Sequence, residues 1–102
     1  VTGATPDAID VYWRPGCPYC SSLLRSLRRS GIPTRLHNIW EDDEAAAAVR
    51  RVARGNETVP TVIVDGRSLV NPGIGAVRAL LADVAPDLVS PPTRGRRWLS
   101  RR

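Results

Sequence analysis

The sequence predicts an α/β protein with a mixed four-stranded sheet and helices on both faces. Apolar residues recur with period two in some segments and with helical spacing in others, and an Asp65-Gly66 pair marks a hairpin turn. A strand–helix–strand opening implies a parallel pair joined by a right-handed crossover, whereas the hairpin adds antiparallel strands. The predicted element order is therefore β-α-β-α-β-β-α, and 102 residues suffice for one compact domain.

The first strand and first helix are predicted over residues 9–13 and 18–30. Apolar side chains alternate with Asp10 and Tyr12 in the strand, and Arg14-Pro15-Gly16 ends it. Pro18 fits a first helical position, where a missing N–H is tolerated. Gly31 fits the residue just past the helix. The apolar face of this helix follows the spacing i, i+3, i+4, i+7, at Cys20, Leu23, Leu24 and Leu27.

The second half of the chain adds three strands and two helices. Residues 34–39 read as a short strand, and the acids at 42–44 favour the start of a helix that runs to Arg54-Gly55. Residues 61–64 form a β-branched run typical of a central strand, and residues 67–70 return after the turn. A third helix ends before Pro86, with one apolar face formed by Val77, Leu80, Leu81 and Val84.

The charge distribution separates a neutral domain from a basic tail. We expect a flexible lead at 1–8, the domain at 9–86 and a basic, disordered tail at 87–102. The net charge of +5 lies entirely in residues 90–102, because residues 1–89 contain ten arginines and ten acids. Residues 1–89 therefore have no excess basic charge for nucleic acid. The tail could contact nucleic acid or an anionic membrane, although such ends are more often simply solvated.

Composition also predicts the setting of the protein. No apolar run approaches the roughly 18 residues of a membrane span, and no secretory leader opens the chain. Two cysteines are too few for a disulfide-rich secreted scaffold. We expect a soluble, cytoplasmic monomer.

Cys17 and Cys20 are the candidate catalytic residues. Side chains three apart share a helix face, so the two can form a disulfide, but so short a loop stabilises little. Cys17 precedes the helix, where free N–H groups favour a thiolate, and we expect it to be exposed. Cys20 belongs to the apolar face. These positions predict thiol–disulfide exchange, with Cys17 as nucleophile and Cys20 as resolving thiol.

A metal site is the alternative for this cysteine pair. A structural zinc ion takes four ligands, but the cysteines and the distant His37 supply only three. We therefore expect no metal, and we interpret His37 as a structural or surface residue. Trp13 and Trp40 are expected to be packing residues, because large aromatic side chains dominate small cores.

Residues 13–20, with the sequence WRPGCPYC, resemble the active-site segment of glutaredoxins, which has a C-P-Y-C motif preceded by a basic residue. Thr58-Val59-Pro60 is similar to the T-V-P of that family. The resemblance implies a thioredoxin fold and a cis proline whose preceding backbone pairs with bound substrate. It also implies that Arg14, Pro18 and Tyr19 contribute to substrate binding.

The chain departs from glutaredoxins after the hairpin. Where they have G-G-x-x-D, it has Asn71-Pro72-Gly73-Ile74-Gly75, and residues 69–72 are similar to mycoredoxins. This resemblance implies substrate contact by Asn71, no bound cofactor, and mycothiol rather than glutathione as co-substrate. The implied partners are disulfide-bearing or thiolated proteins and a thiol–disulfide reductase system. An NrdH-type redoxin reduced by thioredoxin reductase and an iron–sulfur carrier or other binding module remain the alternatives.

Overall fold

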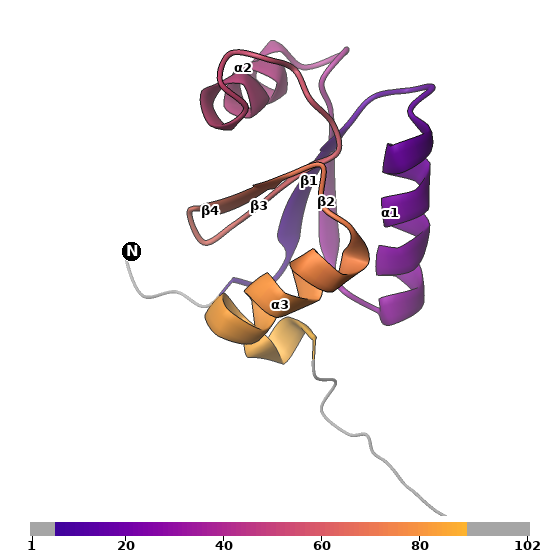
Figure 1. Cartoon of the computed structure of the whole chain (residues 1–102), viewed down its shortest axis with the longest axis vertical. Helices are drawn as coiled ribbons and strands as arrows, with labels where there is room; N and C mark the ends of the chain where they lie inside the picture. The colour runs from indigo at the N-terminus through magenta and orange to yellow at the C-terminus, as the bar shows by residue number, and fades with distance from the viewer. Residues whose placement is uncertain (1–5, 90–102) are drawn as a thin grey trace, which may run out of the picture.

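A computed structural model describes residues 6–89 of the chain (Figure 1). The predictions for residues 1–5 and 90–102, which include the arginines of the tail, lie outside the described residues. The elements are β1 (Ile9–Trp13), α1 (Pro18–Ser30), β2 (Thr34–Asn38), α2 (Asp43–Val52), β3 (Thr61–Val64), β4 (Arg67–Val70), α3 (Ile74–Val84) and a short 3-10 helix, η1 (Pro86–Leu88).

The four strands form one mixed sheet in the order β2-β1-β3-β4. β1 pairs with β2 in parallel, and β3 is antiparallel to both β1 and β4. Asp65 and Gly66 both have positive φ, at 51° and 76°, as a two-residue hairpin turn of the I′ type requires. The predicted fold class and element order are confirmed.

Helices cover both faces of the sheet (Figure 1). On one face, α1 and α3 pack against β1 and β3 around a core that includes Val11, Leu27, Val62 and Leu81. On the other face, α2 contributes a smaller cluster with Val49 at its centre, and Val59 packs against it. The larger core holds α1 against the sheet through Leu23 and Leu27, and the smaller one supports the loop that precedes β3.

Local sequence sets the ends of the two helices nearest the active-site loop. Gly31 takes the left-handed conformation with φ 72°, and its N–H caps the last carbonyls of α1. Asp42 caps α2, since its carboxylate accepts hydrogen bonds from the backbone N–H groups of Glu44 and Ala45 at 3.0 and 3.3 Å. Both ends agree with the prediction from sequence.

The packed part of the chain extends beyond residues 9–86 at both ends. Ala8 is buried, and Asp7 pairs with Arg35 at 3.0 Å. After α3, η1 continues the ordered backbone, and Leu88 and Val89 pack against the core. Apolar area left uncovered by α3 explains why these last residues pack rather than project into solvent. No helix within residues 6–89 is long and apolar enough to cross a membrane.

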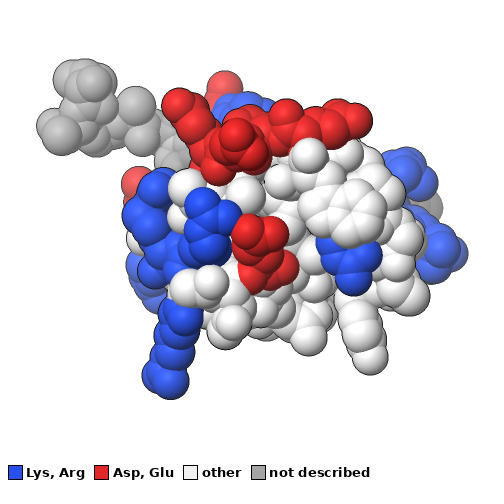
Figure 2. Space-filling view, turned by 90° about the horizontal axis from the view of Figure 1, so that it is seen from above, with Lys and Arg blue, Asp and Glu red and all other residues white. Residues whose placement is uncertain are grey.

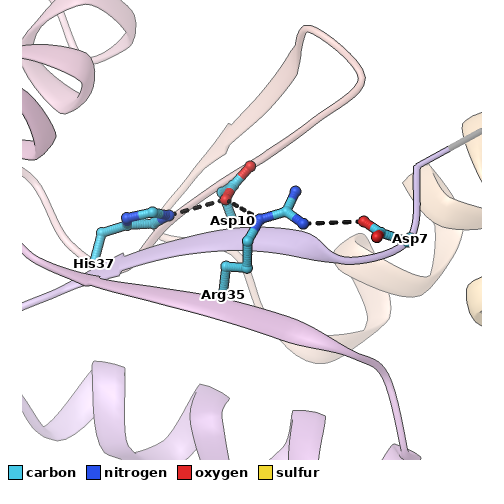
Figure 3. A network of polar contacts seen from close by, with 4 residues as sticks. All are labelled: Asp7, Asp10, Arg35 and His37. Atoms are coloured by element: carbon cyan, nitrogen blue, oxygen red, sulfur yellow. Dashed lines mark hydrogen bonds and ion pairs between the residues drawn. The ribbon is translucent and has the colours of Figure 1, made fainter. Parts of the chain in front are cut away.

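A polar network joins the N-terminal lead to β1 and β2 (Figure 3). Arg35 donates to Asp10 and to Asp7, each at 3.0 Å, and His37 Nε2 lies 2.9 Å from Asp10 Oδ1. Burial alone would raise the pKa of Asp10, but the hydrogen bonds from Arg35 and His37 hold it below its ordinary value. His37 also stacks on Tyr12 with ring centroids 4.7 Å apart, so its contacts are structural, as predicted.

Candidate active site

Cys17 lies where the chain turns from β1 into α1. Gly16 makes the turn with φ 74°, and Cys17 is the N-cap of the helix, in an extended conformation. Its Sγ accepts a hydrogen bond from the backbone N–H of Cys20 at 3.2 Å. One free N–H of the first helical turn therefore points at the sulfur, an arrangement that stabilises negative charge on it.

Cys17 is more covered than the sequence predicted. Its exposed fraction is 5%, and that of Cys20 is 1%. The prediction of an exposed Cys17 is therefore wrong, because the loop before β3 folds over the start of α1. Cys17 Sγ lies 3.9 Å from the carbonyl oxygen of Val59 in that loop. Both thiols are buried, but Cys17 lies against the loop before β3, whereas Cys20 lies on the side of α1 that faces the core.

The loop over Cys17 is held at both of its ends. The Val59–Pro60 peptide bond is cis, as the resemblance to glutaredoxins implied, and Pro60 is buried. The N–H of Asn71 donates to the carbonyl of Pro60 at 2.7 Å, and the Thr61 hydroxyl donates to the carbonyl of Thr58 at 2.9 Å. These bonds connect the predicted loop residues Thr58 and Pro60 to the start of β3 and to Asn71 in the β4–α3 connection.

Burial raises the pKa of the Cys20 thiol to about 11, and its hydrogen bond with Cys17 adds to the shift. Cys20 also packs on the side of α1 that carries Leu23 and Leu27 into the core. With this pKa, the Cys20 thiol is protonated at neutral pH. The environments of the two sulfurs are therefore chemically unequal, as expected.

A groove of about 340 Å³ lies between α1 and the connection from β4 to α3. Tyr19 and Asn71 both line it, so the structure brings these two predicted residues together from distant parts of the sequence. Tyr19 is 69% exposed, and Pro18 is exposed at the first position of α1. The other lining residues come from α1, from the β4–α3 connection and from the first residue of α3: Ser22, Leu23, Ser26, Pro72, Gly73 and Ile74.

Trp40 is not a packing residue. Its exposed fraction is 63%, and the guanidinium carbon of Arg14 lies 5.4 Å from its ring centroid. The predicted burial is wrong because Ile39, directly before Trp40, occupies the place in the smaller core, which leaves the Trp40 side chain on the solvent side of the loop between β2 and α2. Its place between a strand end and four acids was the available indication of this exposure.

The structure also bears on metal binding. Within residues 6–89, no three His, Cys, Asp or Glu side chains lie close enough together to hold a metal ion.

Known proteins match the chain in sequence and in structure. The family model for glutaredoxin matches residues 9–69. Mycoredoxin 1 of Corynebacterium glutamicum is 37% identical over 78 residues, which cover 76% of this chain and 96% of that protein.

Two solved structures share the fold. The crystal structure of the thioredoxin-like protein BC3987 superposes with a TM-score of 0.64 at 25% identity, covering 72% of this chain and 99% of the other. A wheat glutaredoxin superposes with a TM-score of 0.55 at 22% identity, covering 76% of this chain and 81% of the other. The fold is therefore that of the thioredoxin-like proteins.

The family model covers more than half of the chain, and the similarity to Mycoredoxin 1 extends over nearly the whole of that protein. These matches agree with the fold and with the two adjacent thiols at a helix start. The chain therefore belongs to the glutaredoxin family, whose members are thiol–disulfide oxidoreductases.

Proposed function

We propose that this protein reduces mixed disulfides between proteins and a low-molecular-weight thiol, and that the thiol is mycothiol. The observation that carries the reaction is the sulfur of Cys17 at the start of α1, 3.2 Å from the Cys20 N–H and 3.9 Å from the Val59 carbonyl oxygen. The first contact stabilises a thiolate. The second places the sulfur against the loop that would pair with substrate.

In the proposed reaction, the Cys17 thiolate attacks the mycothiol sulfur of the mixed disulfide. The substrate S–S bond breaks, the protein leaves as a thiolate that takes up a proton, and Cys17 becomes joined to mycothiol. The thiolate of a second mycothiol then attacks the mycothiol sulfur of this new disulfide, so that the bond to Cys17 breaks, Cys17 leaves as a thiolate and the two mycothiols form oxidised mycothiol. Alternatively Cys20 loses its proton and attacks Cys17, which releases mycothiol and leaves a Cys17–Cys20 disulfide for a reductase.

Several residues would bind the co-substrate beside this sulfur. The backbone of Thr58-Val59-Pro60 would pair with it, and Tyr19 and Asn71 would contact it from the groove. The choice of mycothiol is supported by the 37% identity to a protein named Mycoredoxin 1. The N-P-G-I-G segment at 71–75 supports it as well, because it replaces the family's G-G-x-x-D.

The setting that we propose is a cytoplasmic monomer with no bound cofactor. Its partners would be thiolated or disulfide-bearing proteins and the reductase system that regenerates the thiol.

The test is a comparison of electron donors with one protein substrate. The substrate is conjugated to mycothiol or to glutathione and each conjugate is supplied with that thiol and its reductase, while thioredoxin reductase alone forms the third assay. We expect turnover to be at least tenfold faster with mycothiol. Faster turnover with thioredoxin reductase alone would contradict the proposal and favour an NrdH-type redoxin, and a coloured, iron-containing protein after anaerobic purification would favour a cluster carrier.

Two variants separate the roles of the thiols. Cys17→Ser should abolish reduction of every mixed disulfide, because it removes the nucleophile. Cys20→Ser should retain reduction of the mycothiol conjugate, since a second mycothiol can resolve the intermediate. Activity in Cys17→Ser above a hundredth of the wild-type rate would refute the assignment, and thermal unfolding of both variants checks that they are folded.

A further inference from the structure

Trp40 is exposed and yet fixed in position beside the active-site loop. Its backbone N–H donates to Asn38 Oδ1 at 2.9 Å, and Arg14 lies 5.4 Å from its ring centroid, within the range of a cation–π contact. Trp40 remains 63% exposed, so Arg14 covers only a part of its ring. An aromatic side chain that is ordered and open to solvent is suited to contact a ligand, because little conformational entropy is lost on binding.

Arg14 connects this ring to the nucleophile. Arg14 precedes Cys17 by three residues, and its Nη1 donates to the carbonyl of Pro15 at 3.0 Å. Its charge also acts on Cys20, where it partly offsets the effect of burial on the pKa of the thiol. The contact between Arg14 and Trp40 therefore places the indole next to the segment that leads into Cys17.

The charges that neighbour Trp40 are mostly negative, although the guanidinium of Arg14 lies against the ring. Four acidic residues, 41–44, follow it directly, and all four are exposed. Figure 2 shows acidic side chains in a band along one border of this end of the molecule, with uncharged surface beside them. Glutathione carries two carboxylates and one ammonium group at neutral pH, so its net negative charge is repelled by such a border.

A neutral, hydroxyl-rich ligand fits the same surroundings. Mycothiol is an acetylated cysteine in amide linkage to an amino sugar and an inositol, and its thiol is its only ionisable group. The C–H faces of its rings can lie flat on an indole, and its hydroxyl groups can donate to carboxylates and accept from a guanidinium.

We propose that Trp40, with Arg14 against it, forms the platform that binds the sugar–inositol portion of the thiol during the reaction at Cys17. Trp40 would then determine which thiol is used without touching the reacting sulfurs. This inference rests on the proposed function for the identity of the thiol.

The experiment uses two conjugates of one reporter peptide. One carries mycothiol and the other carries N-acetylcysteine as its neutral methylamide, which has the same uncharged reactive end but lacks the rings. The variants are Trp40→Ala, Trp40→Phe and, as a control, Leu36→Ala, which truncates a 51% exposed side chain on β2. The measurement is the ratio of kcat/KM for the mycothiol conjugate to that for the N-acetylcysteine conjugate.

We expect Trp40→Ala to lower this ratio about tenfold through a higher KM for the mycothiol conjugate, because binding outside the reacting atoms changes KM rather than kcat. Trp40→Phe should restore a part of the ratio, and Leu36→Ala should leave it within twofold of wild type. An unchanged ratio in Trp40→Ala would overturn the inference, as would an equal loss with both conjugates. Failure of the proposed function is distinguishable, because wild-type protein would then show no preference for mycothiol over glutathione.

Discussion

The buried position of Cys20 predicts an unusual pH dependence for its reactivity. In Cys17→Ser, Cys20 is the one thiol of the chain. Its pKa in the wild-type protein is about 11 against an ordinary 9.0, and burial is the first cause of the difference. Burial does not depend on the sulfur of Cys17, so the substitution should remove only the smaller contribution made by the hydrogen bond between the thiols.

The magnitude follows from the fraction of thiolate at a given pH. At pH 7, a thiol with the ordinary pKa of 9.0 is about one part in a hundred thiolate, whereas a pKa of about 11 leaves about one part in ten thousand. Only the thiolate reacts with iodoacetamide. We therefore expect the thiolate fraction of Cys20 to be about 10- to 100-fold below that of an ordinary thiol.

The assay is the rate of alkylation of Cys17→Ser between pH 6 and 10.5, followed by mass spectrometry. The rate should rise about tenfold per pH unit through pH 9 without levelling off. The same variant unfolded in guanidinium is the control, and its rate should level off near the ordinary pKa. A plateau at or below pH 9 in the folded protein would refute the reasoning, because it would show that burial does not suppress ionisation. Limited access lowers the absolute rate but does not create a plateau.

Two further predictions concern stability. Leu27→Ala should lower the free energy of unfolding by about 2–5 kcal/mol in urea titrations, because Leu27 is 1% exposed in the main core; Leu36→Ala is the exposed control, and equal losses in the two variants would contradict the core assignment. Asp10→Asn should be less stable than wild type at pH 7 by about 1 kcal/mol. Since folding lowers the pKa of Asp10 from its ordinary 3.8, the stability that it contributes is present above about pH 4 and is lost as pH falls through the folded pKa. The two proteins should therefore converge in urea titrations near pH 2, and a constant difference from pH 7 to pH 2 would count against the ion pairs of Asp10.

The fold could be predicted from sequence because each element carries a local pattern. The apolar spacing from Cys20 to Leu27 predicts α1 with its buried face, and Gly31 predicts its end. Asp65-Gly66 predicts the hairpin that fixes the register of β3 and β4. These patterns depend on residues a few positions apart, so no long-range contact was needed to interpret them.

The surroundings of the site depended on contacts that local patterns do not contain. The covering of Cys17 follows from a loop 42 residues away in the chain, and nothing near Cys17 indicates it. The exposure of Trp40 depends on where both cores end, so the general preference of tryptophan for the interior gave the wrong answer. The hydrogen bond from the Asn71 N–H to the Pro60 carbonyl likewise depends on the pairing of β3 with β4, so no pattern near either residue predicts it.

The polar network on β1 and β2 also has a consequence for association between molecules. β2 is an edge strand, and an unpaired edge can accept a strand from another chain. Arg35 and His37 project from this strand and are tied to carboxylates of the same molecule. A second chain that added a strand here would have to place its side chains beside these fixed charged and polar groups, so the network discourages aggregation along this edge.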